Sequence, residues 1–484
     1  TRGTVDQAVA IDEVKRFIAQ QDLDAATRFV PEKVIPKVDG EFDQQIAIIG
    51  GGPAGLSCAY YLAEKGYRPT VFEKEQRLGG MLENGLPSFR LEKDVVQAEI
   101  DVLREMGVQF RCGVEVGKDV TIAQLRQEGF RGFYVAVGLQ SGGKLDIPGG
   151  DAQGVMAGID FMRQVNGGQC SKLAGPVVVI GGGNIAADVA RTAVRCGAES
   201  VDLYCLEGYD EMPMGAEDRS ECERDGITIH AGWGQTEIVT ENGHAAGIRF
   251  RKCLRVKDDQ GRFAPVFDDN DACEAACATV LYCIGQKVDW RQLLTGTAVT
   301  FNPNGTAQVD PVTYQTAEPD IFAGGDAVTG QKFAIDAIAA GKEGAISLHR
   351  FVQKATLTIG RNRRRFVELD KENALIPVGF DNTPRQRIGY NEALRRTFRD
   401  ERVAFTAEQV QKETARCLSC GASVVDPNKC IGCGVCTTKC AFDAIHLHRE
   451  RPECTNMIPS EDKMKAILPY MVKRQIKIRK AGRK

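Results

Sequence analysis

The sequence has no apolar stretch as long as the roughly 18 to 20 residues that a membrane-spanning helix needs. It also shows no signal-peptide pattern. Its formal net charge is only -3, so no strong overall field draws the chain toward nucleic acid or a membrane. These absences argue against a membrane protein and against a general nucleic-acid binder, and we expect a cytoplasmic protein.

Cysteine is missing from the first part of the chain, since none precedes Cys58. Seven of the seventeen cysteines instead fall between Cys417 and Cys454. In a long chain, this uneven use indicates a reducing compartment and metal or redox chemistry rather than a disulfide framework. The remaining cysteines, such as Cys196 and Cys283, fall in core-like segments, where we expect buried apolar thiols.

A strand, a glycine-rich turn, a helix and a second strand follow one another between residues 46 and 73. The apolar run 46–49 predicts a strand buried on both faces of a parallel sheet. Behind it stands Gly50-Gly51-Gly52-Pro53-Ala54-Gly55, whose G-x-G-x-x-G spacing permits a tight turn, close approach of a pyrophosphate and close packing of the helix. The second strand ends at Glu73, where a carboxylate accepts hydrogen bonds from a ribose diol. The pattern predicts a dinucleotide site, and a glycine turn without a ligand is the alternative.

A second unit of the same kind begins at Pro176. A strand at 177–180 runs into Gly181-Gly182-Gly183-Asn184-Ile185-Ala186, followed by a predicted helix at 187–196 and a strand at 201–205. Ala186 takes the third glycine position, where a methyl group still fits between helix and strand. Two such units in one chain indicate dinucleotide binding more strongly than either does alone.

Two later stretches complete these folds. Residues 227–283 alternate short strands with turns such as Glu241-Asn242-Gly243, which predicts hairpins. Residues 320–326 form a further strand, glycine turn and acid, and a helix is expected from about 333 to 351.

Four cysteines share the C-x2-C-x2-C-x3-C spacing of bacterial ferredoxins: Cys430, Cys433, Cys436 and Cys440. Ala441 stands where proline is usual, and a short strand is expected at 444–447. Zinc is the alternative, but zinc sites usually take two separated pairs of ligands. The spacing therefore favours a 4Fe-4S cluster.

The sequence leaves two possibilities, one cluster or two. In two-cluster ferredoxins the fourth cysteine of such a run serves the other cluster. Three more cysteines are candidate iron ligands: Cys417, Cys420 and Cys454. Because the second set is one ligand short in this chain, we predict one or two 4Fe-4S clusters.

Several segments together resemble the two-dinucleotide-domain flavoprotein reductases, and among them the small subunit of glutamate synthase and its relatives: Gly50 to Gly55, Arg77 to Gly80, Gly85 to Arg90, Gly181 to Ala186, Glu211 to Pro213 and Gly324 to Asp326. The relatives include the reductase domain of dihydropyrimidine dehydrogenase and subunits of electron-bifurcating transhydrogenases. The resemblance covers roughly residues 5 to 350. It implies an α/β fold in which a Rossmann-like NAD(H) domain is inserted into a Rossmann-like FAD domain.

The resemblance also implies FAD in the first domain, with Glu73 on the adenosine ribose and Asp326 on the ribityl chain. Motifs and resemblance together give the expected cofactor-binding residues: Gly50, Gly52, Pro53, Ala54, Gly55, Glu73, Lys74, Arg77, Gly79, Gly80, Arg90, Val116, Ala136, Gly138, Gly181, Gly183, Asn184, Ile185, Ala186, Glu207, Gly285, Gly325, Asp326 and Ala340. Hydride transfer between nicotinamide and flavin demands no acid-base residue, and we assign no catalytic side chain.

Two departures from the family pattern matter. The family commonly has an Arg-Arg pair that grips the 2′-phosphate of NADPH, and here Leu206 and Glu207 stand in those places. A carboxylate suits a free 2′-hydroxyl and repels a phosphate, which predicts that the protein prefers NAD(H) over NADP(H). The alternative is that Glu207 is only an exposed acid and that the specificity lies elsewhere. Relatives also place iron–sulfur cysteines ahead of the FAD fold. Here we expect them on sequence preceding Thr1 or on a partner.

The sequence therefore predicts an NADH-linked flavin and iron–sulfur electron-transfer subunit that works with at least one other redox protein subunit. The partner could be ferredoxin-like, a dehydrogenase or a synthase large subunit, and an electron-bifurcating complex is one such setting. The alternatives are an NADPH-dependent glutamate synthase small subunit, a nucleotide-binding scaffold and a disulfide reductase. The last needs a C-x-x-C beside the flavin, but Cys273 and Cys277 have three intervening residues.

The expected domains are as follows: a helical N-terminal segment at 1–40, the FAD domain at 41–150 and 291–355, the NAD(H) domain at 151–290, a connector at 356–415, a ferredoxin-like domain at 416–455 and a basic tail at 456–484. The tail and the arginines at 361–365 lack interleaved aromatic residues, so we expect a solvated surface or a partner contact rather than nucleic-acid binding.

Overall fold

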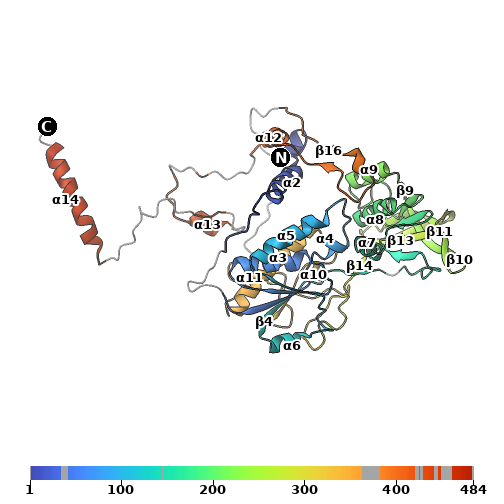
Figure 1. Cartoon of the computed structure of the whole chain (residues 1–484), viewed down its shortest axis with the longest axis horizontal. Coiled ribbons are helices and arrows are strands. Elements are labelled where there is room, and N and C mark those ends of the chain that lie inside the picture. The colour runs from blue at the N-terminus through green and yellow to red at the C-terminus, as the bar shows by residue number, and fades with distance from the viewer. Residues whose placement is uncertain are drawn as a thin grey trace. The chain divides into compact units, whose positions relative to one another are not determined.

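A computed structural model describes residues 2–33, 42–143, 145–361, 382–419, 425, 429–440, 445–447 and 461–481. Contacts divide the chain into a larger unit, Thr1–Gly360 with Asp370–Leu418, and a smaller unit, Arg361–Leu369 with Ser419–Lys484. Figure 1 labels many of the helices and strands.

The first nucleotide fold of the larger unit is built on a five-stranded parallel sheet in the order β15-β4-β1-β2-β3. Its strands are β1 (Gln45–Ile49), β2 (Thr70–Glu73), β3 (Gln109–Cys112), β4 (Phe130–Val135) and β15 (Ile321–Ala323). Its helices are α3 (Pro53–Glu64), α4 (Met81–Asn84), α5 (Lys93–Glu105), α6 (Ile122–Gln127), α10 (Asp326–Thr329) and α11 (Ala334–Val352).

Burial on both faces explains why β1 is apolar from Ile46 to Ile49. Ile46 and Ile48 pack among residues of α3, α5 and α11, while Ala47 and Ile49 pack into a separate core with residues of α6. Figure 1 shows α3, α5 and α11 together over the sheet. The predicted doubly covered parallel strand is confirmed.

The second nucleotide fold has a five-stranded parallel sheet in the order β6-β13-β7-β8-β9. Its strands are β6 (Val155–Ala157), β7 (Val177–Ile180), β8 (Val201–Cys205), β9 (Thr228–Ala231) and β13 (Thr279–Tyr282). Its helices are α7 (Gly158–Asn166), α8 (Asn184–Arg195) and α9 (Ala216–Asp225).

These helices cover one face of the parallel sheet, and a three-stranded antiparallel sheet covers the opposite face. It consists of β10 (Trp233–Glu241), β11 (His244–Lys257) and β12 (Phe263–Ala276). Asn242 and Gly243 connect β10 to β11 with φ of +53° and +80°, the values of a tight two-residue hairpin. The hairpins predicted for this region are confirmed.

The second fold is inserted into the first. Strands β4 and β15 pair in parallel, with Phe133 opposite Ile321, although the whole second fold lies between them in the sequence. A short antiparallel ribbon of β5 (Ser141–Gly142) and β14 (Gln286–Lys287) forms where the chain passes between the two folds. The predicted inserted topology is confirmed.

A segment that we call the strap, residues 382–418, completes the larger unit. It contains β16 (Gly389–Tyr390), a 3-10 turn at Glu392–Leu394, β17 (Arg402–Val403) and α12 (Ala407–Ala415). The N-terminal helices are α1 (Arg2–Val5) and α2 (Ile11–Leu23).

The strap holds the N-terminal segment in place. The buried guanidinium of Arg416 pairs with Glu413 at 2.6 Å and Asp6 at 3.2 Å, and the Glu413 carboxylate accepts a hydrogen bond from the Ala10 N–H at 2.9 Å. Buried charges need partners, and these pairs fix the N-terminal segment on the strap.

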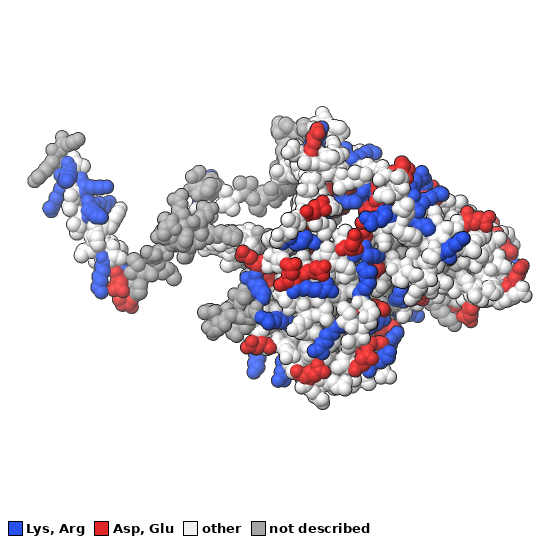
Figure 2. All heavy atoms as spheres, viewed as in Figure 1, with Lys and Arg blue, Asp and Glu red and all other residues white. Residues whose placement is uncertain are grey.

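The smaller unit contains α13 (Val435–Lys439) and α14 (Lys463–Ala481). Residues 445–447 do not form the expected strand, and among the described residues no neighbouring strand is present to pair with them. On the face shown in Figure 2, charges of both signs are mixed over the larger unit, while α14 carries basic side chains and no acidic one. No described helix combines the length and apolar character that would carry it through a bilayer.

Candidate functional site

Two glycines of the first loop are required by the packing of the protein itself. Gly50 has φ of +108°, and a Cβ there would lie 2.4 Å from the carbonyl oxygen of Ala136. A Cβ at Gly55 would lie 1.9 Å from the carbonyl oxygen of Gly50. These glycines therefore let the loop turn sharply at the end of β1 and let α3 lie against it.

The middle glycine of each loop has a different reason to be there. Gly52 has φ of -84° and ψ of -176°, and a Cβ there would meet only the Cα of Gly80 at 3.7 Å. Gly183 has φ of -100° and ψ of 174°, and a Cβ there would meet nothing within 4 Å. Any residue can adopt these conformations, so the protein itself does not exclude a side chain at either position.

The space that those two side chains would fill suits a diphosphate. Gly52 and Gly183 are the residues that precede α3 and α8, and both line the same cavity. The first N–H groups of a helix have no partner within the helix and bind anions. The residues at both loops thus fit the diphosphate of a bound dinucleotide.

Glu73 lies at the base of the first loop. Its carboxylate accepts hydrogen bonds from the N–H of Gly51 at 2.7 Å and the N–H of Glu75 at 3.0 Å. Burial raises the pKa of this carboxyl, and the two N–H donors partly offset that effect. The carboxylate is held in the lining of the cavity, where its predicted contact with a ribose can be made.

Corresponding hydrogen bonds place the two loops alike. The N–H of Gly50 donates to the carbonyl of Phe72 at 2.8 Å, and the N–H of Gly181 donates to the carbonyl of Tyr204 at 2.8 Å. Ala186, at the third glycine position, is fully buried at the start of α8. The second loop is therefore a structural counterpart of the first.

Glu207 brings a carboxylate to the second loop from an unexpected position in the chain. The residue that corresponds to Glu73 in the second fold is Cys205, whose Cβ would lie 3.1 Å from a Cβ at Gly182. Glu207 comes two residues later, and its Oε2 would lie 2.7 Å from that same Cβ. Both loops consequently have a carboxylate over their second residue.

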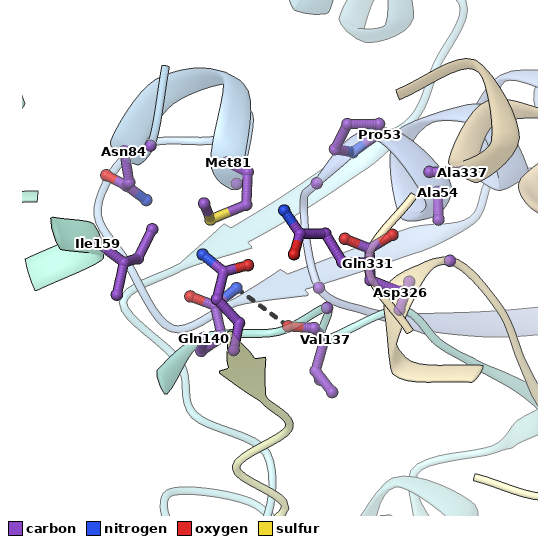
Figure 3. Close-up of a pocket in the computed structure, with 18 of the residues that line it drawn as sticks. Pro53, Ala54, Met81, Asn84, Val137, Gln140, Ile159, Asp326, Gln331 and Ala337 are labelled. Atoms are coloured by element: carbon purple, nitrogen blue, oxygen red, sulfur yellow. Dashed lines mark hydrogen bonds between the residues drawn. The ribbon is translucent and has the colours of Figure 1, made fainter. Parts of the chain in front are cut away.

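A cavity of about 1070 Å³ extends between the two loops. In Figure 3, Met81, Asn84 and Ile159 lie at one end of the part drawn, and Pro53 and Asp326 lie at the other. Ile159 belongs to α7 of the second fold and the other four belong to the first fold. Such a volume is at the upper end of the range of ligand sites, roughly 300 to 1000 Å³.

The cavity brings most of the predicted cofactor residues together. The following predicted residues line it: Gly50, Gly52, Pro53, Ala54, Glu73, Lys74, Gly80, Arg90, Val116, Ala136, Gly138, Gly183, Asn184, Ile185, Ala186, Gly285, Gly325 and Asp326. The other predicted residues are outside the lining: Gly55, Arg77, Gly79, Gly181, Glu207 and Ala340. Among these, Arg77 pairs with Glu83 at 2.7 Å instead of facing the cavity.

Several lining residues were not predicted. They include Met81, Asn84, Gln140, Ile159 and Gln331. Asn84 adjoins the segment 85–90 on which the family resemblance rests, so it could have been found there, whereas Ile159 is one apolar residue among many on α7. Cys283 was expected to be an ordinary core thiol, but it is half-buried and lines the cavity.

The predicted iron ligands are only partly described. Cys430 and Cys433 are exposed on the loop that leads into α13, which contains the left-handed residues Gly432 and Gly434. Cys436 is exposed within α13, and Cys440 directly follows this helix and is half-buried. Cys420 and Cys454 lie outside the described residues. Four thiols within this run fit an iron–sulfur cluster by donor chemistry, although no group of three or more metal-ligating side chains converges among the described residues. Cys417, in the larger unit, is exposed directly after Arg416.

Comparison with known families gives two matches. Residues 44–341 match the family described as pyridine nucleotide-disulphide oxidoreductase. Residues 423–445 match the family described as 4Fe-4S binding domain. The first match covers more than half of the chain, and the second includes the four-cysteine run.

Comparison with individual proteins gives three informative relatives. The chain is 34% identical over 448 residues to the beta subunit of NADP(+)-dependent formate dehydrogenase of Moorella thermoacetica, covering 87% of this chain and 62% of that protein. It is 33% identical over 355 residues to the putative oxidoreductase AegA of Escherichia coli, covering 70% and 53%. It is 31% identical over 356 residues to the NAD-dependent dihydropyrimidine dehydrogenase subunit PreT of Escherichia coli, covering 73% and 78%. The chain thus spans less than two thirds of the first two relatives.

Solved structures share the fold. FprA of Mycobacterium tuberculosis, in complex with NADPH, has a TM-score of 0.55 at 18% identity, covering 64% of this chain and 85% of that one. Thioredoxin reductase of Lactococcus lactis has a TM-score of 0.51 at 19% identity, covering 64% and 100%. At these identities the likeness concerns the arrangement of the two nucleotide folds and not the substrate.

Proposed function

The chain belongs to the pyridine nucleotide-disulphide oxidoreductase family, with an added 4Fe-4S binding domain, and we propose that it is an NADH-linked electron-transfer subunit. In this proposal the first fold binds FAD and the second binds NAD(H). Iron–sulfur centres exchange the electrons with a partner subunit. The observation that carries the proposal is the shared cavity, which reaches two glycine loops whose middle glycines leave room for a ligand.

The residues of this chain bind and orient the cofactors. The N–H groups at the starts of α3 and α8 hold the two diphosphates, and Glu73 holds a ribose hydroxyl pair. Asp326 begins α10 and lines the cavity, where burial raises the pKa of its carboxyl. Bound FAD supplies the chemistry, because it accepts a hydride and gives up single electrons. Hydride transfer between the nicotinamide and the flavin itself needs no acid-base side chain.

The preference for NADH rests on Glu207. A carboxylate over Gly182 can accept hydrogen bonds from a ribose diol, and it repels the 2′-phosphate of NADPH. The names of the relatives point both ways, since the formate dehydrogenase subunit is called NADP(+)-dependent and PreT is called NAD-dependent. The position of the carboxylate in this chain therefore supports NADH.

A partner subunit is part of the proposal. Relatives are named as subunits of larger enzymes, among them the beta subunit of a formate dehydrogenase and the beta subunit of an NADPH-Fe(3+) oxidoreductase. The exposed cysteines of the C-terminal run are accessible for cluster assembly and for electron exchange. We propose that the C-terminal cysteines, with the run Cys430, Cys433, Cys436 and Cys440 at their centre, hold one or two 4Fe-4S clusters.

The disulfide-reductase alternative finds no support at the cavity. Cys273 lies on β12, Cys277 follows it, and neither is among the residues that line the cavity. A dithiol would have to reach the flavin to exchange electrons with it. We therefore retain a single function.

An anaerobic titration of the purified protein tests the proposal. We expect NADH to bleach the flavin absorbance within seconds and then to bleach the broad iron–sulfur absorbance. Reduction by NADPH alone would contradict the assigned specificity and leave the flavin chemistry intact. No bleaching by either nucleotide would contradict electron transfer and favour a scaffold that only binds nucleotides.

Replacing Glu207 by arginine is expected to reverse the preference for NADH. The change removes a repulsive carboxylate and adds a cation that pairs with a 2′-phosphate, so the ratio of kcat/KM for NADPH to that for NADH should rise by roughly 100-fold, or about 2.7 kcal/mol. Steady-state kinetics with an artificial electron acceptor measures the ratio. Glu211→Gln is the control, since Glu211 is a nearby exposed acid, and its ratio should stay unchanged.

A further inference from the structure

The two nucleotide folds have only a narrow covalent connection. The chain passes between them through the β5–β14 ribbon, which pairs Ser141–Gly142 with Gln286–Lys287. Such a short ribbon at the ends of two folds can act as a hinge. Any fixed distance between the flavin and nicotinamide sites must therefore come from contacts across the boundary between the two folds, which we call the seam.

One segment of the first fold makes these contacts, and we call it the clasp, residues 84–92. Asn166, the last residue of α7 in the second fold, donates through Nδ2 to the carbonyl oxygens of Asn84 at 2.9 Å and Leu86 at 3.0 Å. Lys93 of the first fold donates through Nζ to the carbonyl oxygen of Leu86 at 2.6 Å. The clasp backbone is thus fixed from both folds.

Phe89 and Arg90 extend from the clasp to α8 and α9. The buried ring of Phe89 lies 4.9 Å from the Arg191 guanidinium and 3.9 Å from the Arg195 guanidinium, both on α8. A cation close to a ring centre in this way is attracted by it, more strongly when water is excluded.

Arg90 bridges two helices of the second fold. Its Nε donates to Asp188 on α8, its Nη2 donates to Asp218 on α9 at 2.5 Å, and its Nη1 lies 3.7 Å from Glu221. Asp188 is largely buried, and burial raises the pKa of its carboxyl to about 6. Without Arg90, the carboxylates of Asp188 and Asp218 would face each other in a site with little water, which costs free energy, whereas Glu221 would keep its pairing with Arg191.

The place of Asp188 links this contact to the nucleotide. Asp188 lies one helical turn, about 6 Å, after Asn184 at the start of α8. The same helix end would bind the diphosphate of the nicotinamide dinucleotide. Both Arg90 and Asp188 also line the shared cavity. Whatever fixes Asp188 relative to the first fold therefore fixes the nicotinamide relative to the flavin.

We propose that Arg90 is a positioning residue for hydride transfer, which holds α8 against the FAD-binding fold and thereby sets the distance between nicotinamide and flavin. This inference rests on the proposed function. Sequence motifs led us to expect Arg90 at a cofactor, but all three of its guanidinium nitrogens face carboxylates of the second fold.

The strap adds a second layer to the same seam. Arg402 of the strap donates to the carbonyl oxygen of Arg90 at 3.0 Å, and Arg399 pairs with Glu92 at 3.0 Å. On the other side of the seam, Arg195 of α8 donates to the strap carbonyl of Thr397 at 2.8 Å. The strap thus ties the clasp and α8 to a common element.

The test compares Arg90→Met with Arg126→Met by anaerobic stopped-flow reduction with NADH. Arg126 is the matched control, since it pairs with Glu318 at 2.8 Å and Asp320 at 2.7 Å, all within the first fold. A misplacement of about 1 Å can slow a reaction roughly 100-fold. We therefore expect the limiting rate of flavin reduction in Arg90→Met to fall by roughly 10- to 100-fold, with FAD content retained. Arg126→Met should keep the rate of the unmodified protein.

Two further variants separate positioning from general stability. Arg90→Lys keeps one cation at the carboxylates and should recover part of the lost rate. The double variant, Arg90→Met with Asp188→Asn, removes both charges of this pair. The factor by which it lowers the limiting rate should be smaller than the product of the factors for the two single variants. If Arg90→Met loses its FAD or fails to fold, Arg90→Lys decides, because a single ammonium replaces the two nitrogens that donate to Asp188 and Asp218. A lowered limiting rate with FAD retained supports the proposal, and the rate of the unmodified protein overturns it.

The outcomes distinguish this inference from the proposed function. If the unmodified protein is not reduced by NADH or NADPH, the proposed function fails and this inference fails with it. If the unmodified protein and Arg90→Met are reduced at the same limiting rate, the positioning role is wrong and the proposed function stands.

Discussion

Replacing Gly52 by alanine is expected to deprive the purified protein of FAD while leaving the apoprotein at least as stable as before. The backbone of Gly52 suits any residue, and a Cβ there would meet only the Cα of Gly80 at 3.7 Å. A change from glycine to alanine at such a position stabilises a folded chain by about 0.4 to 1 kcal/mol. The same methyl group would occupy the space of the diphosphate, at a cost of about 2 to 3 kcal/mol or a roughly 100-fold loss of FAD affinity.

The measurement is the ratio of flavin to protein after gel filtration, together with thermal unfolding of the apoprotein. Gly55→Ala is the contrasting variant, because its Cβ would lie 1.9 Å from the carbonyl oxygen of Gly50. That variant should lower the unfolding temperature of the apoprotein itself. Full FAD content in Gly52→Ala would show that the first loop does not approach a diphosphate closely, and it would contradict the assigned site.

Local sequence patterns predicted the two nucleotide folds because each unit forms from neighbouring residues. The strand at 177–180 has the bounds that the sequence indicated, and α8 begins at Asn184, three residues earlier than expected. The loop residues take part in the helix start, so the boundary was placed too late. The fully buried Ala186 shows why the third position of the loop needs only a small residue.

Contacts between distant segments could not be read from the sequence in the same way. Arg90 and Asp188 are separated by 98 positions, and no motif indicates that they pair. Arg90 was expected at a cofactor because its segment resembles that of relatives, whereas its charged partners are set by how the folds meet. The role of the strap likewise depends on single contacts between distant residues, such as that between Arg402 and the carbonyl of Arg90.

The case of Glu207 depends both on a local sequence pattern and on the folded path of the chain. Its position two residues after β8 was apparent from the sequence, and its acidic character suggested the preference for NADH. The approach of its Oε2 to Gly182 depends on the path of the loop after Cys205, which only the folded chain defines. The sequence thus supplied the candidate residue, and the structure supplied the reason to test it.

Replacing Gly183 by alanine is expected to leave FAD in place and to abolish reduction by NADH at concentrations that reduce the unmodified protein. A Cβ at Gly183 would meet no protein atom within 4 Å, and its backbone is extended, so the second fold should remain intact. The methyl group would instead lie where the nicotinamide dinucleotide places its diphosphate, and NADH affinity should fall roughly 100-fold. Equilibrium titration of NADH under anaerobic conditions measures this affinity, and dithionite reduces the flavin independently of the second fold.

Gly52→Ala and Gly183→Ala control for each other, because the two positions are alike in conformation and in their place before a helix, and they belong to different folds. If each loop serves its own dinucleotide, the first variant loses FAD, and the second keeps FAD and loses its response to NADH. Loss of FAD in both variants would mean that one ligand spans both loops. Because the cavity is continuous from Gly52 to Gly183, that result would reassign the second loop to the flavin and require another site for the nicotinamide.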